Sequence, residues 1–405
     1  MKSNILNKCL YGQECTSCLL CASICPTNAI TIDLTDSGFY RPSVDEKKCI
    51  DCSKCKRVCY KFDEKIQDDC IDKYTCYSAI NNNNSELLTS TSGGVSNEIM
   101  KECLRLGYKI IGVSYDYNNN RAISKIVDNE LELEDFKGSK YFQSYTHSAF
   151  KELINDKSSQ KYAIFGTPCQ IYSLSKYKEL VGNKERYLLI DIFCHGCPSI
   201  NLWRKYLESK KSEFKKERFD KISFRSKDYG WHEYGISFYS KGEVRRSKKI
   251  NDPFYEIFFD KNAFNRACYK CKLRSTFRYS DIRIGDFWGV EYDRNTTGVS
   301  AVVLSSDYGK KIFDNIKDKF KIKEHKFEEV VRAQSYKKEH NINENLRDET
   351  LRMLKSDMKL EDIIQQYRSK YSIKKKIKIN IKNTLKILPS NIYSNLKFVV
   401  HKVRK

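Results

Sequence analysis

The residues of this chain best suited to chemistry are its 17 cysteines, which are unevenly spread over 405 residues. Eleven of them, from Cys9 to Cys76, lie in the first 76 residues, and two runs with C-x-x-C-x-x-C-x-x-x-C spacing stand 34 residues apart. In a reducing compartment such thiols bind metals rather than form disulfides. The spacing predicts two 4Fe-4S clusters, because three cysteines surround one cluster while the fourth reaches the other.

Each predicted cluster therefore draws on both halves of the repeat, as in bacterial two-cluster ferredoxins. One cluster takes Cys15, Cys18, Cys21 and Cys59, and the other takes Cys49, Cys52, Cys55 and Cys25. Zinc is disfavoured, because structural zinc sites need only C-x2-C pairs and would leave thiolates over. The pattern departs from its usual form at Tyr60, which stands after Cys59 where a proline is expected. This departure affects the turn and not the ligands.

A second group of cysteines is scattered along the chain. The candidate ligands of a third 4Fe-4S cluster are Cys169, Cys194, Cys268 and Cys271, with Cys197 as the alternative to Cys194. Pro168 suits the first position of a helix, which would put Cys169 at a helix N-terminus where backbone N–H groups stabilise a thiolate. Zinc on the same residues and unligated core cysteines are the alternatives.

A third candidate site is the segment Thr89-Ser-Thr-Ser-Gly-Gly94, which precedes a helical apolar pattern formed by Val95, Ile99, Cys103 and Leu106. The hydroxyl residues predict a capped helix. Two glycines and free N–H groups at such a helix start would also let a phosphate approach. From the residue types alone, an ordinary capped helix is the favoured interpretation.

The elements that must position these residues predict an α+β protein. Apolar runs at 109–115, 162–165, 188–193 and 281–284 read as strands separated by polar or helical stretches, which favours a mixed α/β domain. The predicted division is a ferredoxin domain at 1–62, a polar linker at 63–88, a domain at 89–335 that binds the third cluster and a basic helical tail at 336–405. Within the first domain, 29–32 and 39–42 read as two strands joined by a turn.

Composition places the chain among soluble globular proteins, with 40% apolar, 13% aromatic and 31% charged residues. The chain has no apolar run long enough to cross a membrane, and its first residues lack the apolar stretch of a signal peptide, so a cytoplasmic location is expected. The formal charge is +22, but twelve basic and no acidic residues lie between Arg368 and Lys405. Nucleic-acid binding is therefore not expected, since the charge gathers in the tail.

Taken in order, the motifs resemble the coenzyme F420 hydrogenase/dehydrogenase beta-subunit family, with a two-cluster ferredoxin fused at the N-terminus. The motifs that carry this resemblance are Thr91-Ser-Gly-Gly94, Gly138-Ser-Lys-Tyr141, Gly166-Thr-Pro-Cys-Gln170, Cys194-His-Gly196, Cys268-x-x-Cys271 and Asp281-Ile-x-Ile-Gly-Asp-Phe-Trp-Gly289. The resemblance implies a flavin, FAD by family habit, beside the third cluster. The residues it implies for flavin binding are Ser92, Gly93, Gly94, Val95, Ser96 and Lys140.

The resemblance also implies an oxidoreductase that exchanges electrons between a hydride carrier, such as a deazaflavin, and single-electron iron–sulfur centres. A small metabolite is another candidate substrate, since relatives of this type accompany polysaccharide biosynthesis. The competing hypothesis is an electron-transfer adaptor that feeds a redox partner protein or ferredoxin and has no substrate of its own. The expected route runs from flavin to third cluster, ferredoxin clusters and external partner.

The basic tail allows two interpretations. Ile373, Ile377, Ile381, Leu385 and Leu388 are spaced like one helical face with lysines between them, which resembles a basic amphipathic helix at a membrane surface. The alternative is a solvated helix that packs its apolar side on the body of the protein. Peripheral membrane contact is therefore one of two open expectations.

Overall fold

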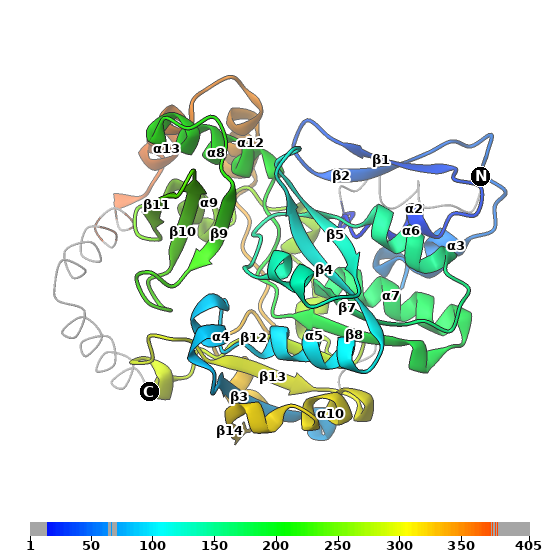
Figure 1. Ribbon diagram of the computed structural model, residues 1–405. Coiled ribbons are helices and arrows are strands. Elements are labelled where there is room, and N and C mark those ends of the chain that lie inside the picture. Colours follow the sequence, from blue (N-terminus) through cyan, green and yellow to red (C-terminus); the bar gives the residue numbers. More distant parts are fainter. Residues whose placement is uncertain are drawn as a thin grey trace.

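The structure is a computed structural model that describes residues 14–63, 66, 71–373, 375, 377 and 379 (Figure 1). In its N-terminal part, the two repeated cysteine motifs have the same backbone conformation. The first cysteine loop holds Ser17 and Leu19 at φ 59° and 65°, and the second holds Asp51 and Ser53 at φ 60° and 57°. Left-handed backbone is unfavourable for such residues and recurs where a loop wraps a functional group. The two cysteine loops therefore share one unusual geometry.

Short elements connect these loops. Helices α2 (Leu20–Ser23) and α3 (Lys54–Arg57) follow the first cysteines of each half, and strands β1 (Ile30–Leu34) and β2 (Tyr40–Val44) form an antiparallel hairpin between them. The predicted strand, turn and strand at 29–42 are thus confirmed. The single-turn helix η1 (Tyr60–Phe62) closes the second half.

A nine-stranded mixed sheet forms the centre of the molecule, in the order β14-β3-β13-β12-β8-β7-β4-β5-β6. Its strands are β3 (Thr75–Asn81), β4 (Tyr108–Asp116), β5 (Arg121–Val127), β6 (Ser144–Tyr145), β7 (Lys161–Gly166), β8 (Tyr187–Ile192), β12 (Ile282–Asp286), β13 (Ser300–Leu304) and β14 (Phe320–His325). Strands β4, β7, β8 and β12 run parallel, so their carboxyl ends meet at one edge. All four predicted strands belong to this parallel group.

Helices cover both faces of the sheet (Figure 1). On one face, α5 (Val95–Arg105) and α10 (Asp307–Asp314) pack on the side chains around Ile110. On the other face, α6 (His147–Asn155) and α7 (Pro168–Val181) pack around Ile111. Leu20, Ile24 and Val58 of the N-terminal part join this second cluster, so the cysteine loops are anchored on the α6 and α7 side.

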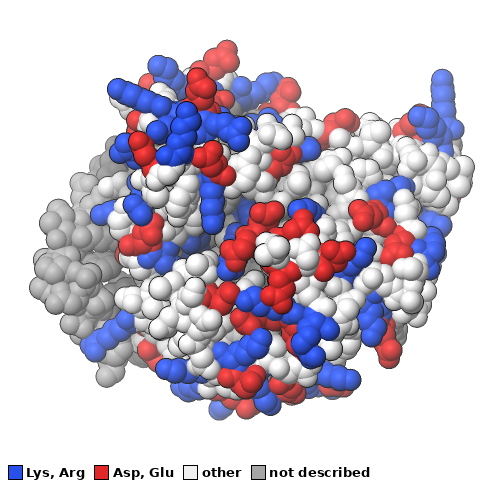
Figure 2. All heavy atoms as spheres, viewed as in Figure 1, with Lys and Arg blue, Asp and Glu red and all other residues white. Residues whose placement is uncertain are grey.

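A second layer holds a three-stranded antiparallel sheet of β9 (Lys221–Ser226), β10 (Gly235–Ser240) and β11 (Glu243–Lys248). Around it lie α8 (Ile200–Phe214), α9 (Pro253–Asp260), α12 (Glu344–Lys355) and α13 (Leu360–Ser369). The remaining short helices are α4 (Asn84–Thr89), α11 (Phe327–Val331), η2 (Ile71–Lys73), η3 (Leu131–Phe136), η4 (Lys184–Arg186), η5 (Arg266–Cys268), η6 (Lys272–Ser275), η7 (Val290–Tyr292) and η8 (Lys317–Lys319). Basic and acidic side chains are interspersed over the face seen in Figure 2.

Two segments differ from the sequence-based expectation. The predicted linker at 63–88 contains β3, which lies between β13 and β14 in the sheet, and the helix α4. The predicted tail from 336 contains α12 and α13, whose Leu354, Ile363 and Tyr367 are buried against α8 and α9. The packing partners of both segments lie far away in the sequence, so the local sequence pattern did not reveal these elements.

The predicted amphipathic helix is described only at its beginning. Ile373 and Ile377 are 77% and 53% exposed, whereas Ile379 packs against the cluster around α13. Ile381, Leu385 and Leu388 lie outside the described residues. In the part of the chain that is described, no helix combines the length and apolarity needed to cross a membrane.

Candidate functional site

The first predicted cluster set is brought together under α7. Burial, together with neighbouring Cys59 and Cys15, raises the pKa of the Cys18 thiol to about 11. Burial and the same neighbours, with Cys18 itself, hold the pKa of Cys21 well above its usual value. Thiols whose pKa is raised in this way lose their protons readily only when a cation neutralises them. The set is therefore suited to a metal cluster.

The second predicted set lines one small cavity. Cys25, Cys49, Cys52 and Cys55 surround a space of about 20 Å³ together with Pro26 and Ile50. The backbone N–H of Ala29 donates to Cys25 Sγ over 3.3 Å, a contact that favours a thiolate. Cys52 is exposed and Cys25 and Cys55 are buried, so this set reaches the protein surface on one side.

The third set forms from three separate parts of the fold. Cys169 is the second residue of α7, whose start is fixed by a capping box between Thr167 and Gln170. The predicted helix start at Pro168 is thereby confirmed. Cys194 and Cys197 follow β8, and Cys268 and Cys271 flank the turn between η5 and η6.

The five thiols of this region influence one another. Burial raises the pKa of Cys194 to about 11, with Cys271 adding to the rise, and burial raises that of Cys268 to about 12, with Cys194 and Cys271 adding. Burial also holds the pKa of Cys197 well above its usual value, helped by Cys268 and Cys194. The structure thus brings both Cys194 and Cys197 close to the other thiols of this region.

These thiols are not arranged around a single ion. Within residues 14–63, 66, 71–373, 375, 377 and 379, no three His, Cys, Asp or Glu side chains lie close enough to hold one metal ion. A tetrahedral zinc site places its sulfur ligands about 2.3 Å from one centre. A cubane cluster holds its cysteines on separate iron atoms and so keeps them further apart.

Arg283 fixes the turn that carries Cys268 and Cys271. It lies on β12, is 1% exposed, and forms a bidentate ion pair with Asp191 on the neighbouring strand β8. Its guanidinium also donates to the carbonyls of Leu273, Arg274 and Thr276. The Arg283 side chain therefore connects this turn to the sheet.

A short set of contacts joins the first and third cysteine sets. Cys18 Sγ lies 3.2 Å from Ser173 Oγ, which donates to the carbonyl of Cys169 over 3.0 Å. Tyr60, next to Cys59, accepts a hydrogen bond from the backbone N–H of Lys272, next to Cys271, over 3.1 Å. The first set is thus adjacent to the third.

A cavity of about 780 Å³ opens at the carboxyl ends of the parallel strands. Its wall includes Val113 of β4, Phe165 of β7, Ile192 of β8 and Ile284 of β12. Cys194 and Cys197 line it as well, so the cavity and the third cysteine set share a wall. Ligands of open α/β sheets bind at this position.

The start of α5 forms another part of the wall. Gly94 is its N-cap, with φ 87° and no side-chain cap, so the expected hydroxyl cap is wrong. Ser92, Gly94, Val95, Ser96 and Lys140 line the cavity. Gly93 is not among the lining residues; a Cβ there would lie 2.0 Å from the carbonyl oxygen of Ala79, so its glycine serves close packing on β3.

Lys140 has a different environment from that expected of a cofactor-binding lysine. Its Nζ donates to the carbonyls of Val113, Asp135 and Lys137 over 2.9–3.0 Å. Burial lowers its pKa to about 7. These three bonds use all three donors of an ammonium group, so Lys140 holds the 135–140 loop in the cavity wall.

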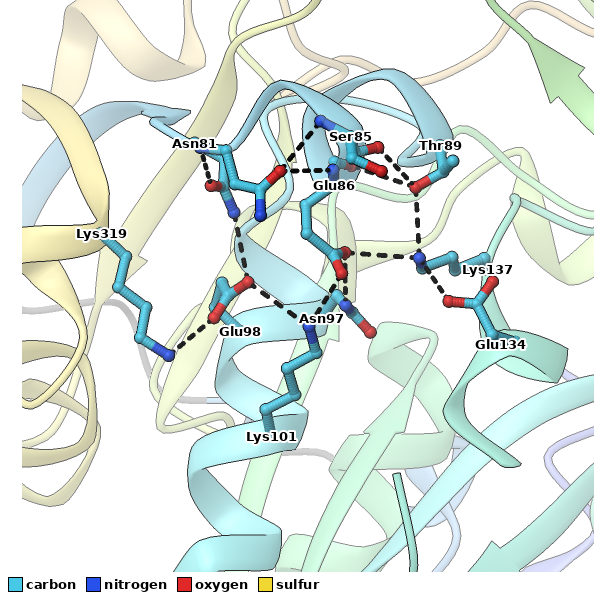
Figure 3. A network of polar contacts seen from close by, with 11 residues as sticks. Asn81, Ser85, Glu86, Thr89, Asn97, Glu98, Lys101, Glu134, Lys137 and Lys319 are labelled. Atoms are coloured by element: carbon cyan, nitrogen blue, oxygen red, sulfur yellow. Dashed lines mark hydrogen bonds and ion pairs between the residues drawn. The ribbon is translucent and has the colours of Figure 1, made fainter. Parts of the chain in front are cut away.

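A polar network links this loop to α5 (Figure 3). Glu86 of α4 accepts from Asn97 over 2.7 Å and from Lys101 over 2.8 Å, and it pairs with Lys137 at 3.3 Å. Glu98 pairs with Lys319 in the same network. Asn97 and Lys137 both line the cavity, so the network braces two of its walls against each other.

Several residues of the site escaped the sequence analysis. Arg225 on β9 pairs with Asp286 at the end of β12, and its guanidinium lies over the Tyr234 ring at 4.2 Å. Arg274 and Arg283 lie buried beside the third cysteine set. The only available signal was their position near the Cys268 and Asp281 motifs, since basic residues are usually exposed.

Two protein-family models match parts of this chain. Residues 159–330 match the family described as the C terminus of the coenzyme F420 hydrogenase/dehydrogenase beta subunit, and residues 14–61 match the 4Fe-4S dicluster domain. A chain of the F420-reducing [NiFe] hydrogenase complex from Methanosarcina barkeri is 16% identical with a TM-score of 0.46, over 74% of this chain and 95% of that chain. No curated protein sequence matches.

The two family matches cover the cysteine motifs from which the resemblance was inferred. They confirm a chain of mixed α/β architecture with an iron–sulfur ferredoxin domain at its N-terminus, of the oxidoreductase and electron-transfer class. The family resemblance inferred from the motifs is thus confirmed, since residues 159–330 match the C terminus of the coenzyme F420 hydrogenase/dehydrogenase beta subunit and residues 14–61 match the 4Fe-4S dicluster domain.

Proposed function

We propose that this chain is a flavin- and iron–sulfur-dependent oxidoreductase. It exchanges electrons between a two-electron hydride carrier, of the deazaflavin type, or a small metabolite, and one-electron 4Fe-4S centres. The observation that carries the proposal is the cavity whose wall contains Cys194 and Cys197. A flavin bound there would accept a hydride in one step and release its electrons singly.

The residues present fit such a cofactor. The volume of about 780 Å³ lies within the range of cofactor pockets, roughly 300–1,000 Å³. The α5 N-terminus offers backbone N–H groups at Val95 and Ser96, where the pyrophosphate of FAD would bind. Aromatic side chains such as Phe165, Tyr141 and Trp288 provide apolar walls for a ring system.

The third cluster in this proposal is held by Cys169, Cys194, Cys268 and Cys271, with Cys197 as the alternative to Cys194. Support comes from the mutual influence of their thiols and from the helix N-terminus beneath Cys169. The contacts through Ser173 and Tyr60 support an order from the cavity to the third set and then to the first set. This order suits electron exchange between a ligand in the cavity and a redox partner protein.

The outer end of this order lies at Cys52. It is exposed, and the neighbouring Ile50 is 63% exposed. An exposed cluster ligand beside an exposed apolar side chain suits a redox partner that docks transiently, with the cluster close to the contact surface. A role in polysaccharide biosynthesis would be set by the substrate in the cavity and stays part of the proposal.

The experiment that tests the proposal measures iron, acid-labile sulfide and flavin per chain after anaerobic purification. About 12 iron and one flavin per chain would support it, and reduction of the bound flavin by deazaflavin and other hydride donors would then be screened. About 8 iron and no flavin after reconstitution would contradict it. That result would favour an adaptor that carries electrons through the ferredoxin domain alone.

A further inference from the structure

Arg274 is a buried cation without a carboxylate partner. It is 5% exposed, and its guanidinium donates to the carbonyls of Cys268 over 2.8 Å, Tyr269 over 2.9 Å and Lys338 over 3.0 Å. Its Nε has no hydrogen-bond partner, and none of the described carboxylates pairs with it. A buried charge held only by carbonyl dipoles is costly unless an opposite charge lies close by.

The charged groups around Arg274 do not supply that opposite charge. The nearby Asp191 is already in a bidentate pair with Arg283. Lys261, His195 and His340 also feel the positive charge of Arg274, which together with burial lowers the pKa of each of them. Their environment is therefore positive, and the missing negative charge must come from another group.

The thiols of the third cysteine set lie within reach of Arg274, and they become anionic when they bind an iron–sulfur cluster. The Arg274 guanidinium bonds directly to the backbone of Cys268, and its charge counteracts the rise in the pKa of both Cys194 and Cys268. Arg274 also lines the same cavity as Cys194 and Cys197. A 4Fe-4S cluster with four thiolates carries net negative charge, which one-electron reduction increases by one.

We propose that Arg274 is the counter-charge of the third cluster and raises the reduction potential of that cluster. This inference rests on the third cluster of the proposed function. A fixed positive charge stabilises the reduced cluster more than the oxidised one, because the reduced form carries one electron more and gains no proton. Charge near the cluster and hydrogen bonding around it are the levers by which a protein sets such potentials.

The test is a redox titration of the full-length, anaerobically purified protein, with dithionite as reductant and EPR as the readout of each cluster. We expect the R274Q variant to lower the equilibrium constant for reduction of one cluster at least about tenfold, which is about 59 mV for one electron. The other two clusters should keep their potentials. R274K retains the charge, so we expect less than half of that shift.

The matched control is R266Q, because Arg266 precedes the same turn but is exposed and paired with Glu344. We expect R266Q to leave all three potentials unchanged. If R274Q fails to assemble the third cluster while R274K assembles it, the requirement for charge is also supported. Unchanged potentials in R274Q, or loss of the cluster in both variants, would overturn the inference.

The two proposals fail in different ways. A wild-type protein with only two EPR-active clusters would refute the third cluster, and the counter-charge with it. Three clusters in the wild type, with R274Q and wild type titrating alike, would refute only the role of Arg274.

Discussion

Replacing Arg283 by methionine should disrupt the third cysteine set. The substitution removes a cation whose partner, Asp191, is equally buried: their side chains are 2% and 3% exposed. It also removes the donors to the carbonyls of Leu273, Arg274 and Thr276. Because these groups are buried, water would not restore the lost contacts in the folded protein.

The magnitude follows from these contacts. Leaving one partner of a buried ion pair uncompensated costs about 3–5 kcal/mol, and each unpaired carbonyl adds about 1 kcal/mol. This sum is comparable to the whole stability of a typical domain, about 5–15 kcal/mol. We therefore expect R283M to lose the order of the Cys268–Cys271 turn and to hold about 8 iron per chain instead of about 12.

The assay combines iron content with the urea midpoint followed by near-UV circular dichroism. The informative partner is the double variant R283M/D191N, which removes both charges and so leaves no buried ion unpaired. We expect it to recover most of the midpoint lost in R283M, as replaced buried ion pairs often do. A midpoint of R283M within error of the wild type, or a double variant no better than R283M, would refute this reasoning.

Four other changes test separate features. C194S should abolish the EPR signal of the third cluster while C197S retains it, and the reverse result would exchange their roles. G93A should lower flavin occupancy and destabilise the fold by about 1–3 kcal/mol, because its Cβ would press on Ala79, as measured by flavin content and urea unfolding. Burial and Arg274 lower the pKa of His340 to about 4, so His340 stays neutral in the folded protein but is protonated in the unfolded chain below about pH 6.5. The free energy of unfolding should therefore fall as the pH drops from about 6.5 to 4. Urea titrations at each pH should show a smaller fall for H340Q. Removal of residues 373–405 should abolish co-sedimentation with anionic liposomes; sedimentation equal to that of the full chain would discard the membrane contact.

The sequence predicted those parts of the site whose cysteine ligands lie close together in the chain. The ferredoxin cysteines follow one another within each loop, so their spacing alone shows how they meet. The third set was predicted from residue types placed after strands, since Cys169 and Cys194 both follow parallel strands. Neither prediction needed knowledge of side-chain packing.

The remaining features depend on distant partners. Strand β3 lies within the segment 63–88 that was predicted as a polar linker, and it pairs with residues more than 200 positions away. Buried arginines are hard to predict for a similar reason, because the free-energy cost of burying their charge is offset by carbonyls and carboxylates of other elements. Lys140 lines the cavity, but its hydrogen bonds to the backbone of its own loop and of β4 could not be predicted from the sequence.

The position of β3 in the sheet also affects the order in which the sheet and the cysteine sets form during synthesis. Residues 75–81 leave the ribosome early but pair with residues 300–304 and 320–325, so the sheet cannot close until most of the chain has been made. The cysteine loops before β3 close over short sequence distances, and they can form long before that point. Cluster insertion into the ferredoxin loops should therefore precede completion of the third cysteine set, which waits for Cys268 and Cys271. A ribosome stalled after residue 250 would carry a nascent chain with the first two cysteine sets complete and the third still missing two ligands.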